Sequence, residues 1–359
     1  MLDVQVAGPI GDIEIDTQFT TEAGTVTALF GPSGAGKTTV INMIAGLVKP
    51  QIGRITINDE VLFDSNSAID QPPDKRGVGY VFQENLLFPH LTVKGNLCYG
   101  QKLTPKIDRY VNFDEVIELL GISTLLARRP ASLSGGEKKR VALGRSLLAN
   151  PRVLLMDEPL AGLDTHRKHE ILPFIEGIRQ EVQLPIVYVS HDIGEVLRLS
   201  DQIALIENGR TVLVGPSETV ANHADARRLI GKNDPSTIVS GTVTSQDSGF
   251  GLTNLETQAG LIRIPEIKIP PGSPIRLRLH SRNISIALSK PRDISILNVL
   301  PGTIENIEQI DGSAVDVQIR IATRIVILAR ITSLARKNLN LSIGTSVFAL
   351  IKSVAVDRI

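Results

Sequence analysis

The stretch Val26-Thr-Ala-Leu-Phe30, followed at once by Gly31-Pro-Ser-Gly-Ala-Gly-Lys37-Thr38, decides the fold of this chain. The first run predicts a buried strand, and Thr38 to Leu47 has the spacing of a helix, so a glycine-rich turn joins the two. This turn fits the pattern G-x-x-x-x-G-K-[ST]. Its glycines let successive backbone N–H groups point at a phosphate, and the helix N-terminus adds the positive end of its dipole. The sequence therefore predicts a phosphate-binding loop in which Lys37 reaches the terminal phosphates and the Thr38 hydroxyl completes a Mg²⁺ shell.

A second apolar run, Val153 to Met156, ends in the carboxylates Asp157 and Glu158. A buried strand would deliver Asp157 at its carboxyl end, the edge at which open α/β sheets bind ligands. We expect Asp157 to hold Mg²⁺ through water and Glu158 to activate an attacking water as general base. The alternative is a surface Asp-Glu turn that caps a helix. The phosphate loop upstream favours the first interpretation.

Strands and helices alternate along the first part of the chain. The predicted helices, besides the one after the loop, are 113–120, 136–149 and 165–181, and the further predicted strands are 3–6, 12–16, 78–82, 186–189 and 203–206. Such alternation implies an α/β domain whose mixed or parallel sheet is covered on both faces.

The pattern changes after Lys232, where proline-rich turns separate short strands predicted at 275–279, 314–321, 324–328 and 347–351, with a short helix at 333–337. Residues 272–281 and 344–353 share the order glycine, turn, strand, basic or imidazole side chain, serine, at an offset of 72. Duplication and chance both explain this echo. We expect three parts: an α/β domain over 1–230, a β-rich linking lobe over 231–290 and an all-β domain over 291–359.

Composition limits the function classes. The chain has 359 residues, 38 Lys and Arg against 38 Asp and Glu, and one cysteine, Cys98. The balanced charge indicates no nucleic-acid partner, and the single cysteine fits a reducing compartment such as the cytosol. The acidic N-terminus lacks the pattern of a signal peptide, and no apolar run approaches the roughly 20 residues of a spanning helix. Any work at a membrane is therefore expected to take place on its surface, through partners.

The segment Leu133-Ser-Gly-Gly-Glu137, upstream of the acidic strand, resembles the signature of ATP-binding cassette (ABC) ATPases. In the same order, Gln83 in Tyr80-Val-Phe-Gln83 resembles the Q-loop of that family, Ala161-Gly-Leu-Asp164 its D-loop and His191 its switch histidine. The resemblance covers about residues 1–230. It implies a P-loop NTPase cassette with a helical subdomain, followed here by the all-β domain.

The resemblance also implies a role for each motif residue. Glu158, His191 and Gln83 would be catalytic, and Thr38, Gln83 and Asp157 would hold Mg²⁺. ATP would be bound by Gly31, Pro32, Ser33, Gly34, Ala35, Gly36, Lys37, Thr38 and Thr39 and, from a second copy of the chain, by Ser134, Gly135, Gly136, Glu137 and Asp164. One signature per chain implies a homodimer that ATP holds together. The chain departs from the family in one respect, because Phe19 is the only aromatic residue before Phe30 that could stack on adenine.

Two further stretches resemble parts of molybdate importers. The segment 84–97, with Leu86, Leu87 and Phe88 expected to be exposed, is similar to the importer region that receives a permease. Two integral-membrane permease subunits and, indirectly, an external substrate-binding protein are thus implied partners. The stretch 294–304 resembles the opening of molybdate- and tungstate-binding OB-like (Mop/TOBE-like) domains. The oxyanion-contacting positions of those domains fall on Ser295, Ser333, Lys352 and Ser353, and Leu297 stands where related domains can carry arginine.

Together the resemblances imply the ATPase subunit of a molybdate or tungstate importer, on the cytoplasmic face of the cell membrane. Molybdate or tungstate bound between the C-terminal β regions (the tails) of two chains is expected to bias the dimer away from transport. The alternative is a tail that has only a structural role and forms the dimer. Other possibilities are an importer for sulfate, ferric ion, polyamine or sugar and, in a different class, an oxyanion sensor without turnover. Intact Glu158, Gln83 and His191 argue against the sensor.

Overall fold

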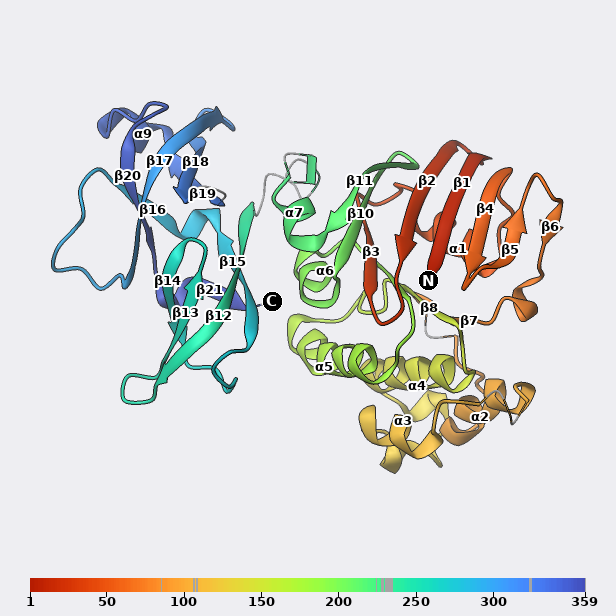
Figure 1. Ribbon diagram of the computed structural model, residues 1–359. Coiled ribbons are helices and arrows are strands. Elements are labelled where there is room, and N and C mark those ends of the chain that lie inside the picture. Colours follow the sequence, from red (N-terminus) through yellow and green to blue (C-terminus); the bar gives the residue numbers. More distant parts are fainter. Residues whose placement is uncertain are drawn as a thin grey trace. The chain divides into compact units, whose positions relative to one another are not determined.

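The strand β3 (Val26–Phe30) lies inside an 11-stranded sheet in the computed structural model of the chain (Figure 1). Every residue of β3, β8 (Val153–Asp157) and β9 (Ile186–Ser190) is buried. The neighbours β10-β3-β9-β8-β7 are all parallel, which explains the apolar runs of these strands. Because the carboxyl ends of parallel strands meet at one edge, the turns that follow β3, β8 and β9 lie together.

The structure describes residues 1–84, 86–105, 107, 109–223, 225–226, 229, 235–322 and 325–358. The chain divides into two units, Met1–Val220 and Ala221–Ile359. Asn85, Arg324 and the predicted boundary between residues 230 and 231 lie outside the described residues. The threefold division at 230 and 290 stays a prediction.

The sheet of the first unit is mixed. Its order is β6-β5-β4-β1-β2-β11-β10-β3-β9-β8-β7, and β1 pairs antiparallel with both β2 and β4. The other strands are β1 (Leu2–Ile10), β2 (Ile13–Thr21), β4 (Ile52–Ile57), β5 (Glu60–Asp64), β6 (Ile69–Asp70), β7 (Val78–Val81), β10 (Gln202–Glu207) and β11 (Arg210–Pro216).

Helices bury two separate cores against this sheet. Helix α1, which follows the phosphate loop, packs its buried residues against β1, β2 and β4, whereas α2 to α5 share the second core. Figure 1 shows α2, α3 and α4 gathered at one side of the unit. The helices are α1 (Lys37–Ala45), α2 (Val93–Leu103), α3 (Phe113–Leu119), α4 (Gly135–Leu148), α5 (Thr165–Glu181), α6 (Ile193–Leu199) and α7 (Ser217–Ala221), with 3-10 turns η1 (Pro73–Lys75), η3 (Ser123–Leu125) and η4 (Pro130–Ser132).

The last turn of α1 is held by a buried arginine. Arg76 is 0% exposed, and its guanidinium donates hydrogen bonds to the carbonyls of Met43 (2.7 Å), Ile44 (3.0 Å) and Gln71 (2.7 Å). It also pairs with Asp70 at 2.9 Å. The bond to Ile44 supplies a partner that the helix end lacks, and the bond to Met43 adds to the one from the Gly46 amide. The bond to Gln71 ties this end of the helix to the segment after β6 and so helps to fix the helix that carries Lys37 at its other end.

The second unit consists of two five-stranded sheets, β14-β13-β12-β15-β21 and β16-β20-β17-β18-β19, which share one hydrophobic core. Its elements are β12 (Ser236–Asp247), β13 (Leu252–Thr257), β14 (Gly260–Pro265), β15 (Pro274–His280), η5 (Ser281–Asn283), β16 (Ile284–Ala287), β17 (Asn298–Gln309), β18 (Ala314–Ala322), β19 (Ile325–Thr332), α9 (Ser333–Asn338), β20 (Ser346–Ile351), η6 (Ser353–Ala355) and β21 (Val356–Arg358).

The repeated sequence of this unit corresponds to a repeated structure. β15 and β20 carry the two echo segments, and each is followed by a 3-10 turn and a short strand. Each short strand crosses to the other sheet: Ile284 of β16 pairs with Ile351 of β20, and Val356 of β21 pairs with Leu279 of β15. These four positions keep the offset of 72 residues, so the exchange is reciprocal. The symmetry favours duplication over chance.

Candidate functional site

The phosphate loop connects β3 to α1 in an open, cradle-like turn. Gly34 and Gly36 have φ values of +79° and +95°, and a Cβ at Gly34 would meet nothing within 4 Å. Lys37 is 5% exposed and its Nζ donates to the carbonyls of Gly31 and Pro32, both at 2.8 Å. Burial lowers the pKa of Lys37, and the nearby Asp157 and Glu158 charges oppose this shift. The loop can thus bind an anion through its backbone N–H groups and the buried ammonium group of Lys37.

Two side chains that carry oxygen atoms, Thr38 and Asp157, meet where α1 begins and β8 ends. The Thr38 hydroxyl donates to Asp157 Oδ1 at 3.1 Å, and Asp157 is 4% exposed. Burial raises the pKa of the Asp157 carboxyl, while the Thr38 hydrogen bond opposes that shift. A hydroxyl and a carboxylate beside a phosphate loop fit Mg²⁺, which takes one or two protein oxygens and fills the remaining positions with phosphate oxygens and water.

Glu158 and His191 come together from adjacent strands. Asp157 of β8 is in register with Val189 of β9, so the next residues of both strands emerge at the same edge. His191 Nδ1 lies 3.0 Å from Glu158 Oε1. Glu158 has a φ of +43°, a conformation that costs a non-glycine residue energy, and its amide donates to the Val189 carbonyl at 3.0 Å. Glu158 is therefore held in a strained turn, next to His191, at the edge that also carries the phosphate loop.

Gln83 lies on the turn after β7, the neighbour of β8. Val81 is in register with Met156, which places Gln83 level with Glu158 along the sheet. Its side chain is exposed and, within the described part of the chain, makes no hydrogen bond. The structure thus brings Gln83 to the correct edge without joining it to Thr38 or Asp157.

The signature residues lie at helix N-termini on the surface. Ser134 caps α4 in a capping box: its side chain accepts from the Glu137 amide at 3.3 Å, and Glu137 accepts from the Ser134 amide at 2.7 Å. Asp164 caps α5 by accepting from the Arg167 amide at 3.0 Å. Gly135 begins α4. Ser134, Gly136, Glu137 and Arg167 line a hollow of about 380 Å³, open to solvent, between the two helix starts.

A partly buried network of side chains next to His191 was missed by the sequence analysis. Lys168 Nζ contacts Glu195 at 2.7 Å and Asp192 at 2.9 Å, and the hydroxyls of Tyr188 and Ser190 donate to Glu195 at 2.8 and 2.9 Å. Against the effect of burial, the hydrogen bond from Lys168 lowers the pKa of Asp192. The network fixes the turn that carries His191. Lys168 lies 24 residues before Asp192 and on another element, so no local pattern indicated this contact.

The expected docking segment is less exposed than predicted. Leu86 is 52% exposed, but Leu87 packs against the second core and Phe88 is half-buried against Tyr99, with ring centroids 4.4 Å apart. The expectation that all three residues are exposed is therefore wrong for Leu87 and Phe88. Phe19 is 4% exposed inside the core, so it presents no face to adenine.

The four predicted oxyanion residues do not converge within one chain. Asn298, at the start of β17, donates to the Ser353 hydroxyl at 3.3 Å, and the exposed Lys352 and Ser295 lie near it in sequence and register. Ser333 accepts from Gln309 at 2.8 Å, at the other end of β17. A site that uses all four positions would therefore draw on two copies of the chain.

Fold and sheet-edge geometry together define a nucleotide-binding cassette of the ABC transporter class. The ABC transporter family matches residues 15–161, and the TOBE domain family matches residues 294–357. Among the described residues, no helix has the length and apolar character needed to cross a membrane.

Proteins that align with this chain over its full length show to which family of ABC transporter ATPases it belongs. Proteins named molybdenum import ATP-binding protein ModC, from Paramagnetospirillum magneticum and Mesorhizobium japonicum, are both 47% identical to this chain. The alignments cover 100% and 99% of this chain and 98% and 95% of those proteins. The chain belongs to this family of ABC transporter ATPases.

Solved structures match the cassette fold. The structure of cbiO1 from Clostridium perfringens, part of the ABC transporter complex cbiONQ, has 28% identity and a TM-score of 0.54, covering 63% of this chain and 92% of that one. A bacterial ABC transporter cassette described as dimeric has 25% identity and a TM-score of 0.50, covering 60% of this chain and 99% of that one.

Proposed function

We propose that the protein hydrolyses ATP to drive molybdate import through a permease made by other chains, on the cytoplasmic face of the cell membrane. The observation that carries the ATPase function is the meeting of the phosphate loop, the Thr38–Asp157 pair and the Glu158–His191 pair at one sheet edge. The substrate rests on full-length similarity to proteins named as molybdenum importers. This similarity favours molybdate over sulfate, ferric ion, polyamine or sugar, and transport over sensing.

One set of residues in this chain would bind the phosphates and Mg²⁺, and another set would activate the attacking water. A terminal phosphate on the loop is a stronger acceptor than the Gly31 and Pro32 carbonyls, so Lys37 would turn its Nζ to it. Thr38, Asp157 and Gln83 would hold Mg²⁺, which when bound neutralises charge on the phosphate oxygens. Glu158 would accept the proton of the attacking water, and His191 would orient the Glu158 carboxylate.

A second copy of the chain would complete the site. The starts of α4 and α5 present Ser134 and Asp164 at the surface, beside an open hollow. The N-terminus of a 14-residue helix attracts phosphate. We expect these residues to contact ATP bound on the partner's loop, and the dimeric form of the similar bacterial cassette supports this arrangement.

The substitution Glu158→Gln tests the ATPase function. Loss of the general base should lower ATP turnover on the order of a hundredfold or more and leave an ATP-bound dimer that is seen by light scattering. Glu266→Gln, the same change at an exposed position of the second unit, should leave both measurements unchanged. Preserved turnover and unchanged dimerisation in Glu158→Gln would remove this residue from its role.

Reconstituted vesicles test the substrate. The protein is combined with candidate permeases and their external binding proteins, and ATP turnover is measured while molybdate, tungstate or sulfate is supplied outside. Molybdate or tungstate should raise turnover, and sulfate should not. Stimulation by sulfate alone would overturn the substrate assignment while leaving the ATPase intact.

The distance between Ser333 and the pair Lys352 and Ser353 supports feedback inhibition by an oxyanion that binds between the second units of two chains. Molybdate bound by Lys352 and Ser353 of one chain and Ser333 of another would bias the dimer away from transport. Adding molybdate on the cytoplasmic side should then lower turnover, and Ser353→Ala should weaken this inhibition. Inhibition that is unchanged in Ser353→Ala would place the oxyanion elsewhere.

A further inference from the structure

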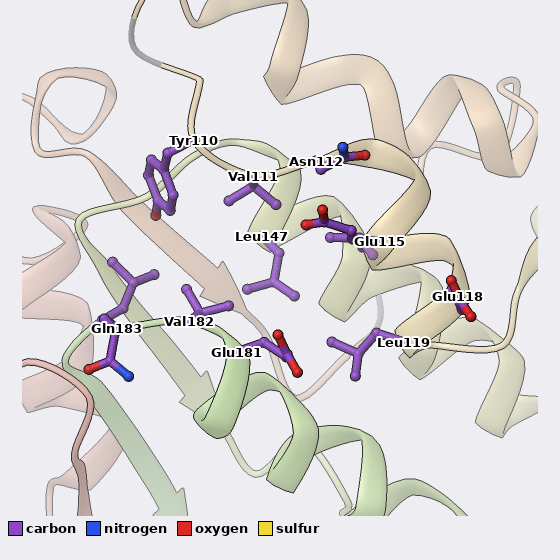
Figure 2. A pocket seen from close by; sticks show the side chains of 12 residues that line it. Tyr110, Val111, Asn112, Glu115, Glu118, Leu119, Leu147, Glu181, Val182 and Gln183 are labelled. Atoms are coloured by element: carbon purple, nitrogen blue, oxygen red, sulfur yellow. The ribbon is translucent and has the colours of Figure 1, made fainter.

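A cavity in the first unit lies away from every residue assigned to ATP or oxyanion. Its volume is about 570 Å³, within the range of small-molecule sites. It is formed by the entry to α3, the end of α4 and the α5–β9 connection. The lining residues are Tyr110, Val111, Asn112, Glu115, Val116, Glu118, Leu119, Leu147, Glu181, Val182, Gln183 and Leu184 (Figure 2).

The cavity combines an apolar floor with acidic walls. Val116 and Leu147 are buried at its base, and Figure 2 shows Leu147 between Glu115 on α3 and Glu181 on α5, with Val182 and Leu119 on either side of Glu181. The other acidic side chain is Glu118. Of the residues that line the cavity, none is a lysine or arginine, whereas three are glutamates.

The three carboxylates are available to a ligand. Glu115, Glu118 and Glu181 are exposed, and none of them forms an ion pair with any residue in the described ranges. The nearby basic side chains of α5 and α6 are engaged elsewhere, because Arg179 pairs with Asp201 and Arg198 with Glu176 at 2.6 Å. The 17-residue helix α5 also ends at Glu181, so its negative dipole end faces the same space.

One wall is aromatic, rigid and uncharged. The Tyr110 hydroxyl donates to the Pro151 carbonyl, and the amides of Tyr110 and Val111 both donate to Asn150 Oδ1 at 2.8 Å. Burial raises the pKa of Tyr110 to about 12, so the phenol stays neutral at physiological pH. An aromatic face next to carboxylates attracts organic cations.

We propose that this cavity binds an amphipathic organic cation, namely an amine or quaternary ammonium that carries an apolar group. The apolar group lies against Leu119, Leu147 and Val182, and the charged nitrogen lies among Glu115, Glu118 and Glu181. The ligand would contact α4 and α5 at the ends opposite to Ser134 and Asp164.

Three probes with the same apolar body test the proposal on the full-length protein. Binding of 4-phenylbutylamine, 4-phenylbutan-1-ol and 4-phenylbutyrate is measured by titration calorimetry without nucleotide. The amine should bind about tenfold more tightly than the alcohol, and the acid more weakly than both, since three exposed carboxylates each contribute a small attraction. Salt at about 0.5 M should reduce the preference for the amine.

Substitutions in the cavity test whether the probes bind there. The triple change Glu115→Gln, Glu118→Gln and Glu181→Gln should reduce amine affinity about tenfold, to that of the alcohol. A control with the same loss of charge replaces three exposed glutamates outside the cavity and should keep the preference: Glu22→Gln, Glu256→Gln and Glu266→Gln. Circular dichroism checks that each variant is folded, and Val182→Trp, which fills the cavity, should weaken amine and alcohol alike.

Three results would each overturn the proposal. They are equal affinity for the three probes, an amine preference that survives the triple substitution, and amine binding weaker than about 10 mM in the parent protein. None of them bears on ATP hydrolysis, which involves other residues.

Discussion

Arg76 offers a direct test of how the phosphate-loop helix is stabilised. In Arg76→Met, the carbonyls of Ile44 and Gln71 lose the guanidinium donor, whereas the Met43 carbonyl keeps the Gly46 amide at 3.2 Å. Each buried carbonyl that loses its donor costs about 1 kcal/mol or slightly more, and the Met43 carbonyl costs less, so the substitution costs about 2–3 kcal/mol. Asp70 adds little, because its side chain is 34% exposed and keeps Lys49 at 3.1 Å. The free energy of unfolding should fall by this amount.

Urea denaturation followed by far-UV circular dichroism measures the change. Within the described residues, every helix of seven or more residues begins and ends in the first unit, so the helical signal reports on that unit. Arg76→Lys, which keeps the charge and part of the donor set, should lose less than Arg76→Met. Arg54→Met is the matched control: Arg54 is 60% exposed and lies 3.9 Å from Asp64, so its loss should cost under about 0.5 kcal/mol.

The size of the loss decides between two accounts of Arg76. If Arg76→Met lowers the free energy of unfolding by less than about 1 kcal/mol, the carbonyls find water or other donors, and the helix does not depend on this side chain. A large loss shared by Arg54→Met would instead mean that arginine charge in general, and not this buried position, stabilises the unit.

Two other substitutions separate stability from function. Because burial raises the pKa of Asp157, the folded protein binds this proton more tightly than the unfolded chain, and the contribution of the carboxyl to stability falls as pH rises through its folded pKa. Asp157→Asn should therefore be more stable than the parent above that pH, equally stable below it and without Mg²⁺-dependent turnover; unfolding curves over a pH series check this. Asn298→Ala loses two hydrogen bonds with the Arg263 backbone, at 2.7 and 2.9 Å, and should destabilise the second unit by about 2–3 kcal/mol in thermal unfolding, whereas Asn338→Ala, at an exposed position of α9, should not.

The sequence predicted the elements that form from local patterns. The helices at 113–120, 136–149 and 165–181 begin and end within one residue of α3, α4 and α5. Apolar runs likewise located β3, β8 and β9, because strands buried on both faces need no partner to be recognised. In contrast, β4 to β6 and β11 were missed, since their partly exposed residues acquire meaning only through pairing with distant strands.

The candidate site was predictable to a similar extent. Motifs indicated Lys37, Thr38, Asp157, Glu158 and His191, and the structure places them at one edge because the parallel register of β3, β9 and β8 does so. The motifs could not predict which other residues stabilise the elements that carry the site. Arg76 acts on carbonyls more than thirty residues away, and no pattern of side chains marks a backbone acceptor.

The reciprocal strand exchange changes how the second unit must be divided. The TOBE match begins at residue 294, yet β20 is paired by β16, which ends at Ala287. A fragment that begins at residue 291 would leave an edge of β20 open and deprive β21 of β15. Asn298 adds a further tie, because it bonds both Ser353 and the backbone of Arg263. Any oxyanion site built on Ser353 is therefore held by both halves of the duplication, and its affinity belongs to the whole unit.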